Sequence, residues 1–342
     1  MIAKQEVLNK PCLINCNYCE LYAKYCNGSK NVSCSPEGIY VLKKQRSKIH
    51  RTIEWFKKIE ATTIKTPFSG ILPRFIPQIR LNDERTFYWL KDPSLKEAFD
   101  TVIIRYDDIG TPMNLINKIL RYNFPTNIII STVIPDKTLD NLHPSIYLLK
   151  LNTINQILTK YGFTLIATTI DTYTYIDDPP LLSWSKMLES LIKAHKLTNS
   201  KIPLIGIVKG ANEKQIEFSI KKLNEMGFKY LGFPCRELME QKIYNLIKFT
   251  TKAIHKTGSK CLLIGFNSLQ LLRKIPYIDS FSGLGWFISA TYGKTYQGLK
   301  RKKTSSKINS KEIATLAAQN LKAIKSYLEN LEKQTIIKDF IF

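Results

Sequence analysis

The sequence predicts an α/β protein built as a (β/α)₈ barrel of the TIM type, and three observations support this prediction. Eight short apolar runs, rich in β-branched residues, recur between residues 68 and 296. Most of them are separated by stretches in which apolar residues recur every three or four positions, the period of an amphipathic helix. The runs are apolar on both faces, as buried parallel strands are. Eight such units in about 230 residues match a closed barrel.

The expected strands follow the chain in a regular order. They read GILPRFI, DTVIIRYD, TNIIISTVI, FTLIATTID, IPLIGIV, KYLGFP, CLLIGF and YIDSFSG. The first is the weakest pattern, because Pro73 and Pro77 lack the N–H group that a sheet uses. An open doubly wound sheet is the alternative, but no glycine-rich fingerprint opens a helix to support it.

The helical pattern is clearest in the stretch EKQIEFSIKKLNEMG. Ile216, Ile220, Leu223 and Met226 fall on one face, at positions i, i+4, i+7 and i+10. Gly227 stands where a helix commonly ends in a left-handed residue. The sequence therefore predicts an amphipathic helix between two strands here.

Both ends of the chain differ from the barrel pattern. Residues 1–67 hold five of the seven cysteines, followed by the basic stretch KKQRSKIHRTIEWFKKIE. Residues 297–342 carry the basic run KRKKTSSK at 300–307 and close with an amphipathic helical pattern. We therefore expect a cysteine-rich metal-binding module with a basic helix at 1–67, the barrel at 68–296, and a basic helical extension at 297–342.

The charge balance indicates a polyanionic partner. Lysine and arginine number 51 against 28 acidic residues, a formal net charge of +23. Nucleic acid is the first expectation and a membrane surface the second; a merely solvated basic surface is the alternative. The residues expected to contact phosphates follow the eighth strand and are Lys294, Lys300, Arg301, Lys302 and Lys303.

No apolar run approaches the ~20 residues that span a bilayer, and the first residues lack the apolar core of a signal peptide. We therefore expect a cytoplasmic protein with no membrane partner, whose cysteines are not a disulfide framework. A homodimer is compatible with the sequence.

Polar residues recur where the expected strands end, which is where barrel enzymes hold their active sites. Asp107 and Asp108 follow the second strand, Asp171 follows the fourth, and Lys209 with Gly210 follows the fifth. The eighth strand carries Asp279 and Ser282. The alternative is that some of these acids cap the helices that follow.

The blocks LIGIVKG, YLGFPCRE, LLIGF and IDSFSG…ATYGK, in this order, resemble the second half of the tRNA-guanine transglycosylase superfamily. They are most similar to its divergent branch that inserts 7-deazaguanines into DNA. The resemblance implies exchange of guanine for a 7-deazaguanine in DNA or tRNA. In that reaction a carboxylate attacks the sugar carbon C1′, and the covalent glycosyl-enzyme then accepts the incoming base.

The resemblance also implies roles for individual residues. Asp108 would be the second, proton-moving carboxylate, and Asp171 would accept hydrogen bonds from the purine edge. Lys209 and Gly210 would lie beside the base, with Lys209 in place of the usual glutamine, and Gly232 would belong to a turn that closes over it. The substrate-binding residues are thus expected to be Asp107, Asp171, Lys209, Gly210 and Gly232.

The position of the family's nucleophilic aspartate is occupied by Ser282. A serine with no adjacent base is a poor nucleophile, and no histidine lies near these strand ends. Asp279 or Asp107 could serve instead, although the odd offset of Asp279 from Ser282 places the two on opposite faces of a strand. The candidate catalytic residues are Asp108, Asp279 and Ser282; a barrel that binds nucleic acid without catalysis is the alternative.

The cysteine cluster predicts a metal site with Zn²⁺ or a [4Fe–4S] cluster, and no nucleotide cofactor is expected. Its residues are Cys12, Cys16, Cys19, Cys26 and Cys34. The C-x₃-C-x₂-C spacing of the first three is also that of radical S-adenosylmethionine enzymes, which use (β/α) barrels. A radical enzyme using these three cysteines is therefore a rival prediction.

Overall fold

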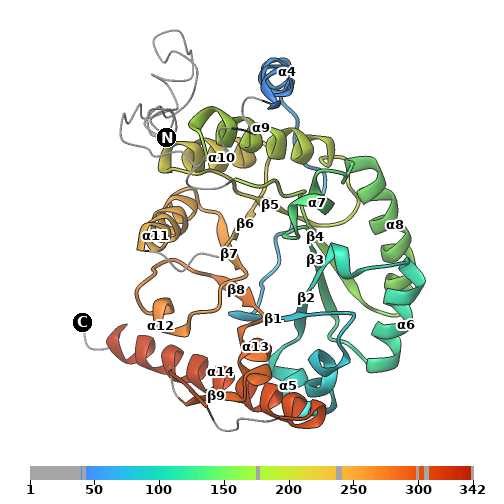
Figure 1. Ribbon diagram of the computed structural model, residues 1–342, viewed down its shortest axis with the longest axis vertical. Helices are drawn as coiled ribbons and strands as arrows, with labels where there is room; N and C mark the ends of the chain where they lie inside the picture. Colours follow the sequence, from blue (N-terminus) through green and yellow to red (C-terminus); the bar gives the residue numbers. More distant parts are fainter. Residues whose placement is uncertain are drawn as a thin grey trace, which may run out of the picture.

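The computed structural model describes residues 40, 44–174, 178–235, 241–297, 300–303 and 308–339. Within them the chain forms a ring of strands surrounded by helices (Figure 1). The predicted cysteine module, from Cys12 to Cys34, lies outside the described residues.

Eight parallel strands form a closed barrel in the order of the sequence, which confirms the predicted fold class. Closure comes from pairing of the last strand with the first, Ile76 lying beside Ser282. The strands are β1 (Phe75–Ile79), β2 (Thr101–Arg105), β3 (Asn127–Ser131), β4 (Thr164–Thr168), β5 (Leu204–Ile207), β6 (Tyr230–Pro234), β7 (Lys260–Ile264) and β8 (Ser280–Gly283).

Helices lie between the strands, in agreement with the periodic patterns. The predicted helix at 213–227 is α10 (Glu213–Glu225); the Asn212 side chain caps its start, and Gly227 follows its end with φ of +86°. The other elements around the ring are η2 (Glu84–Lys91), α5 (Pro93–Ala98), η3 (Tyr106–Asp108), α6 (Pro112–Tyr122), α7 (Asp136–Leu139), α8 (Pro144–Lys160), α9 (Pro180–Lys196), α11 (Gln241–Lys256), α12 (Leu269–Leu272) and α13 (Gly285–Thr291).

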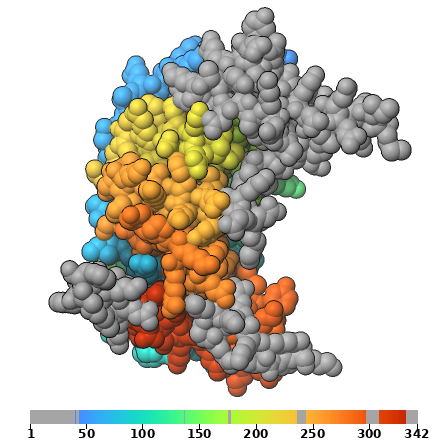
Figure 2. Space-filling model, turned by 90° about the vertical axis from the view of Figure 1, so that its left-hand side faces the viewer, coloured from blue at the N-terminus to red at the C-terminus, as the bar shows by residue number. Residues whose placement is uncertain are grey.

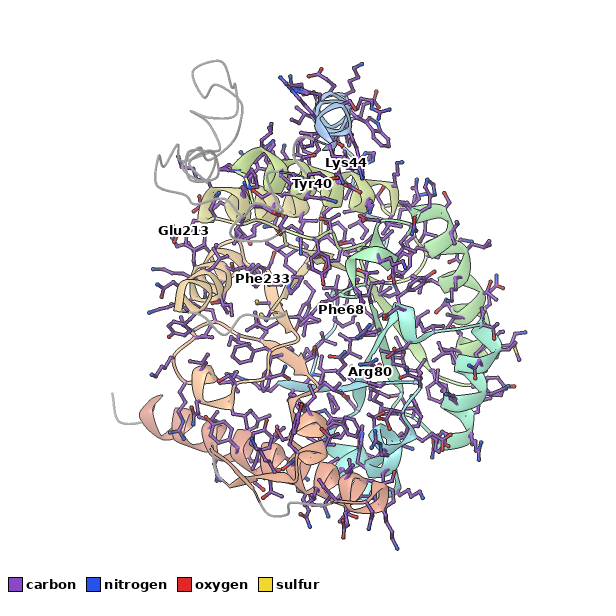
Figure 3. All side chains as sticks on the ribbon, in the orientation of Figure 1. Tyr40, Lys44, Phe68, Arg80, Glu213 and Phe233 are labelled. Atoms are coloured by element: carbon purple, nitrogen blue, oxygen red, sulfur yellow. The ribbon has the colours of Figure 1, made fainter. Side chains whose placement is uncertain are left out.

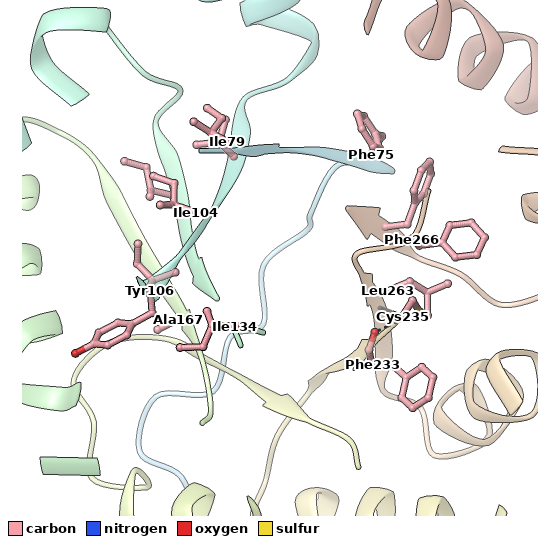
Figure 4. Close-up of a cluster of buried hydrophobic side chains, with 14 of the residues drawn as sticks. Phe75, Ile79, Ile104, Tyr106, Ile134, Ala167, Phe233, Cys235, Leu263 and Phe266 are labelled. Carbon is pink, nitrogen blue, oxygen red and sulfur yellow. Dashed lines mark hydrogen bonds between the residues drawn. The ribbon is translucent and has the colours of Figure 1, made fainter. Parts of the chain in front are cut away.

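Two apolar layers hold the barrel together, because side chains alternate between the faces of each strand. One layer packs between the strands and the helices; Figure 4 shows some of its members, such as Phe75, Ile104 and Leu263. The other fills the inside of the barrel and includes Ile76, Ile103, Ile129, Ile166, Ile205 and Leu262. The barrel is therefore a packed core, and a ligand has room only at an end.

The first strand differs from its prediction. It was expected in GILPRFI, but β1 covers Phe75–Ile79 and includes Pro77. Pro77 is tolerated because of its place in the register: up to Pro77 the strand pairs with β8, and from Gln78 it pairs with β2. The missing N–H thus falls where pairing passes from one neighbour to the other.

The amino end of the barrel is closed by the segment that precedes β1. The Ile64 N–H donates to the Met226 carbonyl and the Phe68 N–H to the Leu204 carbonyl. The Phe68 ring then packs against Tyr230, at 5.5 Å between ring centroids, and Figure 3 shows Phe68 within the ring of strands. Among the residues that the structure describes, this segment covers the amino end and leaves the carboxyl ends of the strands as the side from which a ligand can approach.

Further elements lie outside the ring. Helix α4 (Arg46–Lys57) packs on α9, while the long helix α14 (Ser310–Asp339) packs on α13 and η2, beside the antiparallel hairpin of β9 (Lys294–Gln297) and β10 (Lys300–Lys303). Figure 2 shows one side of the molecule, where the chain runs from α10 in yellow through α11 in orange to α14 in red. Across the described ranges we find no helix with the length and apolar character needed to span a membrane.

Candidate functional site

A cavity of about 300 Å³ opens at the carboxyl ends of the strands. Its polar lining comes from β1 and the residue that follows it, from β2 and β3, and from the loop after β7. Its apolar lining comes from β2, β7 and the segments after β3 and β8. The described residues that line it are Gln78, Arg80, Ile103, Arg105, Ser131, Val133, Ile264, Gly265, Asn267, Leu284 and Ile288. None of them is acidic, so the cavity has a cationic side and an apolar side.

Asp108, the first candidate catalytic residue, lies at this end of the barrel in the 3₁₀ turn η3 that follows β2. The Arg80 Nε–H donates to its Oδ2 at 3.0 Å. The Asp108 side chain is only 4% exposed. Burial raises the pKa of this carboxyl, although the charges of Arg80 and Arg105 pull the pKa down. Such a carboxyl can hold a proton closer to neutral pH than an exposed aspartate can.

Asp107, one residue earlier, is held by the arginine that ends β2. The Arg105 Nε–H donates to Asp107 Oδ1 at 2.8 Å, and an Nη2 N–H donates to Oδ2. This two-point pairing fixes both groups, since guanidinium and carboxylate match in geometry. Both side chains are partly buried.

Asp171 and Lys209, predicted to bind the base, instead form a buried ion pair with each other. The Lys209 Nζ lies 2.8 Å from Asp171 Oδ1, which also accepts from the Thr172 N–H at 2.8 Å. The two side chains, Lys209 and Asp171, are 9% and 3% exposed. Both roles inferred from the resemblance therefore need this pair to open before either group can bind a purine.

The topology places Asp108 and Asp171 at the same end of the barrel, although neither is among the described residues that line the cavity. They follow β2 and β4, the two neighbours of β3 in the barrel, and so share its carboxyl end. Thr132, just after β3, accepts a hydrogen bond from the Asp171 N–H at 2.9 Å. The loops of three consecutive strands thus build one side of the mouth.

Ser282 does not have the surroundings of a nucleophile. It lies beside Ile76 and Ile264 in the barrel wall, on the face that fills the interior, and is fully buried. Its Oγ has no hydrogen-bond partner among the described residues. No base is present among them to take its proton, so the catalytic role predicted for Ser282 does not fit.

Asp279 lies at the opposite end of the barrel from Asp108. It precedes β8 and accepts a hydrogen bond from the N–H of Cys261, near the start of β7, at 2.8 Å. The catalytic role predicted for Asp279 is therefore wrong, because its side chain accepts a backbone hydrogen bond at the amino end of the barrel, away from the cavity. Of the substitutes for the missing nucleophile, only Asp107 lies at the mouth.

The glycines of the predicted site have packing roles. Gly232 lies within β6 and not in a turn; a Cβ there would come within 3.1 Å of the side chains of Ile207 and Ile264. A Cβ on Gly210 would lie 2.7 Å from the backbone nitrogen of Ile216, so this glycine allows α10 to begin close to β5. The predicted closure of Gly232 over a base is incorrect.

The Ser/Gly segment that ends β8 positions Asn267. A Cβ on Gly283 would lie 2.3 Å from the Asn267 Oδ1, so only glycine fits there. The same oxygen accepts the Gly285 N–H at 2.7 Å. This segment therefore shapes the cavity wall and supplies no reactive group.

The sequence analysis did not identify Arg80, Arg105 and Ser131 as residues of the site, although all three line the cavity. The signal that could have found Arg80 is the period of two along β1, since Ile76, Gln78 and Arg80 share the interior face. Placing the first strand five residues too early concealed this alternation.

The predicted metal site remains a prediction, since none of its cysteines is among the described residues. In the described ranges no group of three or more His, Cys, Asp or Glu side chains could hold a metal ion. We expect the full chain, purified without oxygen, to carry metal that is lost when Cys12, Cys16 and Cys19 are changed to serine. Elemental analysis and the absorption spectrum separate colourless zinc protein from a brown iron–sulfur protein; metal-free wild type would contradict the prediction.

No family model matches this sequence, and no curated protein matches it. Solved structures similar to it include a deoxyribose phosphate aldolase from Aeropyrum pernix, with 10% identity, a TM-score of 0.39, and 62% of this chain and 86% of that chain covered. An HpcH/Hpal aldolase/citrate lyase family protein from Burkholderia cenocepacia has 11% identity and a TM-score of 0.39, with coverages of 65% and 93%. A chain of the Amycolatopsis orientalis BexX/CysO complex has 11% identity and a TM-score of 0.41, with 79% of this chain and 95% of that chain covered. Values this low carry no argument about function.

Proposed function

We propose that this protein takes up a guanine-type base of a nucleic acid at the mouth of the barrel and exchanges it for a 7-deazaguanine, as a tRNA-guanine transglycosylase-like enzyme. The observation that carries the proposal is Asp108. It is a nearly buried carboxyl with a raised pKa, bonded to Arg80 beside a cavity at the carboxyl ends of the strands. The sequence blocks described above supply the reaction class.

Base exchange at a glycosidic bond needs one group that moves protons and one that stabilises the sugar carbon. A carboxyl with a raised pKa suits the first task, because it can protonate the departing guanine and later accept a proton from the incoming base. Asp107 is the carboxylate left for the second task, given where Ser282 and Asp279 lie. One of its oxygens would leave Arg105 and bond to C1′ as guanine leaves, while the other keeps its hydrogen bond to Arg105, and the bond to C1′ would break as the new base attacks. The target base must first leave its stack to enter the barrel.

The test is incubation of the full chain with labelled guanine or a labelled 7-deazaguanine and either tRNA or duplex DNA. We expect label in one of the two polymers and none in a sample lacking protein. The Asp108→Asn variant should not incorporate label.

A second candidate is a barrel that binds nucleic acid without catalysis, and the position of Ser282 favours it. The residue that replaces the nucleophile is fully buried and has no base beside it among the described residues. Wild-type protein that binds tRNA or DNA but incorporates no base into either would support this candidate over exchange.

The basic hairpin provides a prediction about affinity. Strands β9 and β10 pair Lys303 with Lys294, and so gather five basic residues in one short hairpin. Replacing Lys294, Lys300, Arg301, Lys302 and Lys303 by alanine should weaken nucleic-acid binding without changing base choice. The slope of log affinity against log salt should fall by about 0.9 for each duplex phosphate that the protein no longer neutralises. Lys160→Ala on α8 is the control, and an unchanged slope in the hairpin variant would refute this role.

A further inference from the structure

We infer that Arg80 and Arg105 form an oxyanion site in the cavity, which holds a phosphate group of the substrate. That this phosphate belongs to a nucleotide rests on the proposed function; that the cavity binds a phosphate does not. The two side chains come from the ends of adjacent strands and line the same cavity.

Each guanidinium has donors to spare. Arg80 gives its Nε–H to Asp108, and Arg105 gives its Nε–H and one Nη2 N–H to Asp107. A guanidinium carries five N–H donors, and in the described part of the chain the remaining ones on these two residues have no acceptor. Two planar sets of donors match the oxygens of a phosphate, which arginine binds at two points.

The paired carboxylates do not block an anion. Asp107 and Asp108 are absent from the described lining of the cavity, whereas their arginines are part of it. Each carboxylate fixes the guanidinium group with which it pairs. The net charge of +23 adds an attractive field for any anion that approaches.

The apolar side of the cavity indicates what else the ligand carries. Val133, Ile264, Leu284 and Ile288 line the wall that completes the cavity around the two arginines. An inorganic anion alone would leave this surface unfilled, while a nucleoside would cover it with its base. The chemistry that fits both sides is a nucleoside phosphate, either free or within a polynucleotide.

A purely structural role would make the two arginines braces for the loops after β1 and β2. Those loops already have other supports. The Lys118 Nζ donates to the Leu81 carbonyl, next to Arg80, and the Lys150 Nζ donates to the Ile109 carbonyl, next to Asp108. Because lysines from α6 and α8 hold both loops, the arginines remain available for a ligand.

The experiment is isothermal titration calorimetry of the full chain with guanosine 5′-monophosphate, guanosine and inorganic phosphate. We expect the monophosphate to bind at least ten-fold more tightly than guanosine. Two neutral-pair variants preserve shape without the charges: Arg80→Gln with Asp108→Asn, and Arg105→Gln with Asp107→Asn. Each should reduce the preference for the monophosphate to less than three-fold, with the thermal midpoint recorded to confirm folding.

Asp100→Asn is the control, since Asp100 is exposed just before β2 at the other end of the barrel and should leave the preference unchanged. Equal binding of guanosine and its monophosphate by wild type, or an undiminished preference in both neutral-pair variants, would overturn the inference. A competition experiment distinguishes the two sources of the phosphate. A short oligonucleotide that binds more tightly than the mononucleotide indicates a phosphate within a polymer, and the opposite order indicates a free nucleotide. If the protein prefers the monophosphate but incorporates no base, the phosphate site is supported and the exchange reaction is rejected. If it incorporates a base but shows no such preference, the exchange reaction is supported and the phosphate site is rejected.

Discussion

Asp108→Asn should reduce incorporation of labelled guanine by roughly 10²- to 10⁴-fold, the contribution of a positioned proton-transfer group. The amide can still accept the hydrogen bond that Arg80 donates at 3.0 Å, so the loop keeps its partner. What it cannot do is give or take a proton. The measurement is the initial rate of incorporation into whichever polymer the wild-type protein labels.

The same variant should be more stable than wild type at neutral pH. Burial raises the pKa of Asp108, so the folded state disfavours its charged form. That penalty is present when the pH is above the raised pKa, and it disappears as the pH falls below the ordinary carboxyl range near 4. The gain in unfolding free energy, from urea titrations, should therefore be seen at pH 7 and vanish in acid.

Asp100→Asn is the control for both readouts. Asp100 is exposed, just before the same strand β2 at the closed end of the barrel, and should change neither rate nor stability. A rate near the wild-type value in Asp108→Asn would remove Asp108 from the chemistry, and with it the observation on which the proposed function depends.

Breaking the buried ion pair should have the largest effect on stability. Lys209→Met leaves the Asp171 carboxylate buried without the ammonium that lies 2.8 Å from it. Removing one partner of a buried pair costs about 3–5 kcal/mol, because the remaining charge is uncompensated. Urea unfolding followed by circular dichroism measures this loss.

The double change of Lys209→Met with Asp171→Leu removes both charges and provides the comparison. It should recover most of the loss, since well-packed apolar replacements of buried pairs are often neutral. A single variant as stable as wild type would mean that the pair is open to water in solution. In that case Asp171 would be free to bind a purine edge as the sequence resemblance implies.

The order of residues along the chain was sufficient to predict the barrel and the positions of its acids after the strands. Eight runs apolar on both faces can be buried only between an inner and an outer layer, and the helical period between them supplies the outer one. The ends of parallel strands meet at one edge, so Asp108 and Asp171 could be placed at the same mouth from their positions alone. Gly227 likewise marked the end of α10, because its backbone conformation favours glycine.

What each group faces depends on how distant segments pack, and this could not be predicted. Arg80 is 28 residues from Asp108, and Lys209 is 38 residues from Asp171, so neither pairing can be read from local spacing. Asp279 and Ser282 are three residues apart, yet one lies at the closed end and the other in the barrel interior. A shift of one residue in register moves a side chain to the other face of a strand, and the register is set by packing across the whole ring. The sequence alone therefore determined at which end of the barrel the site lies. The packing of distant strands determined that Arg80 and Arg105 line the cavity there.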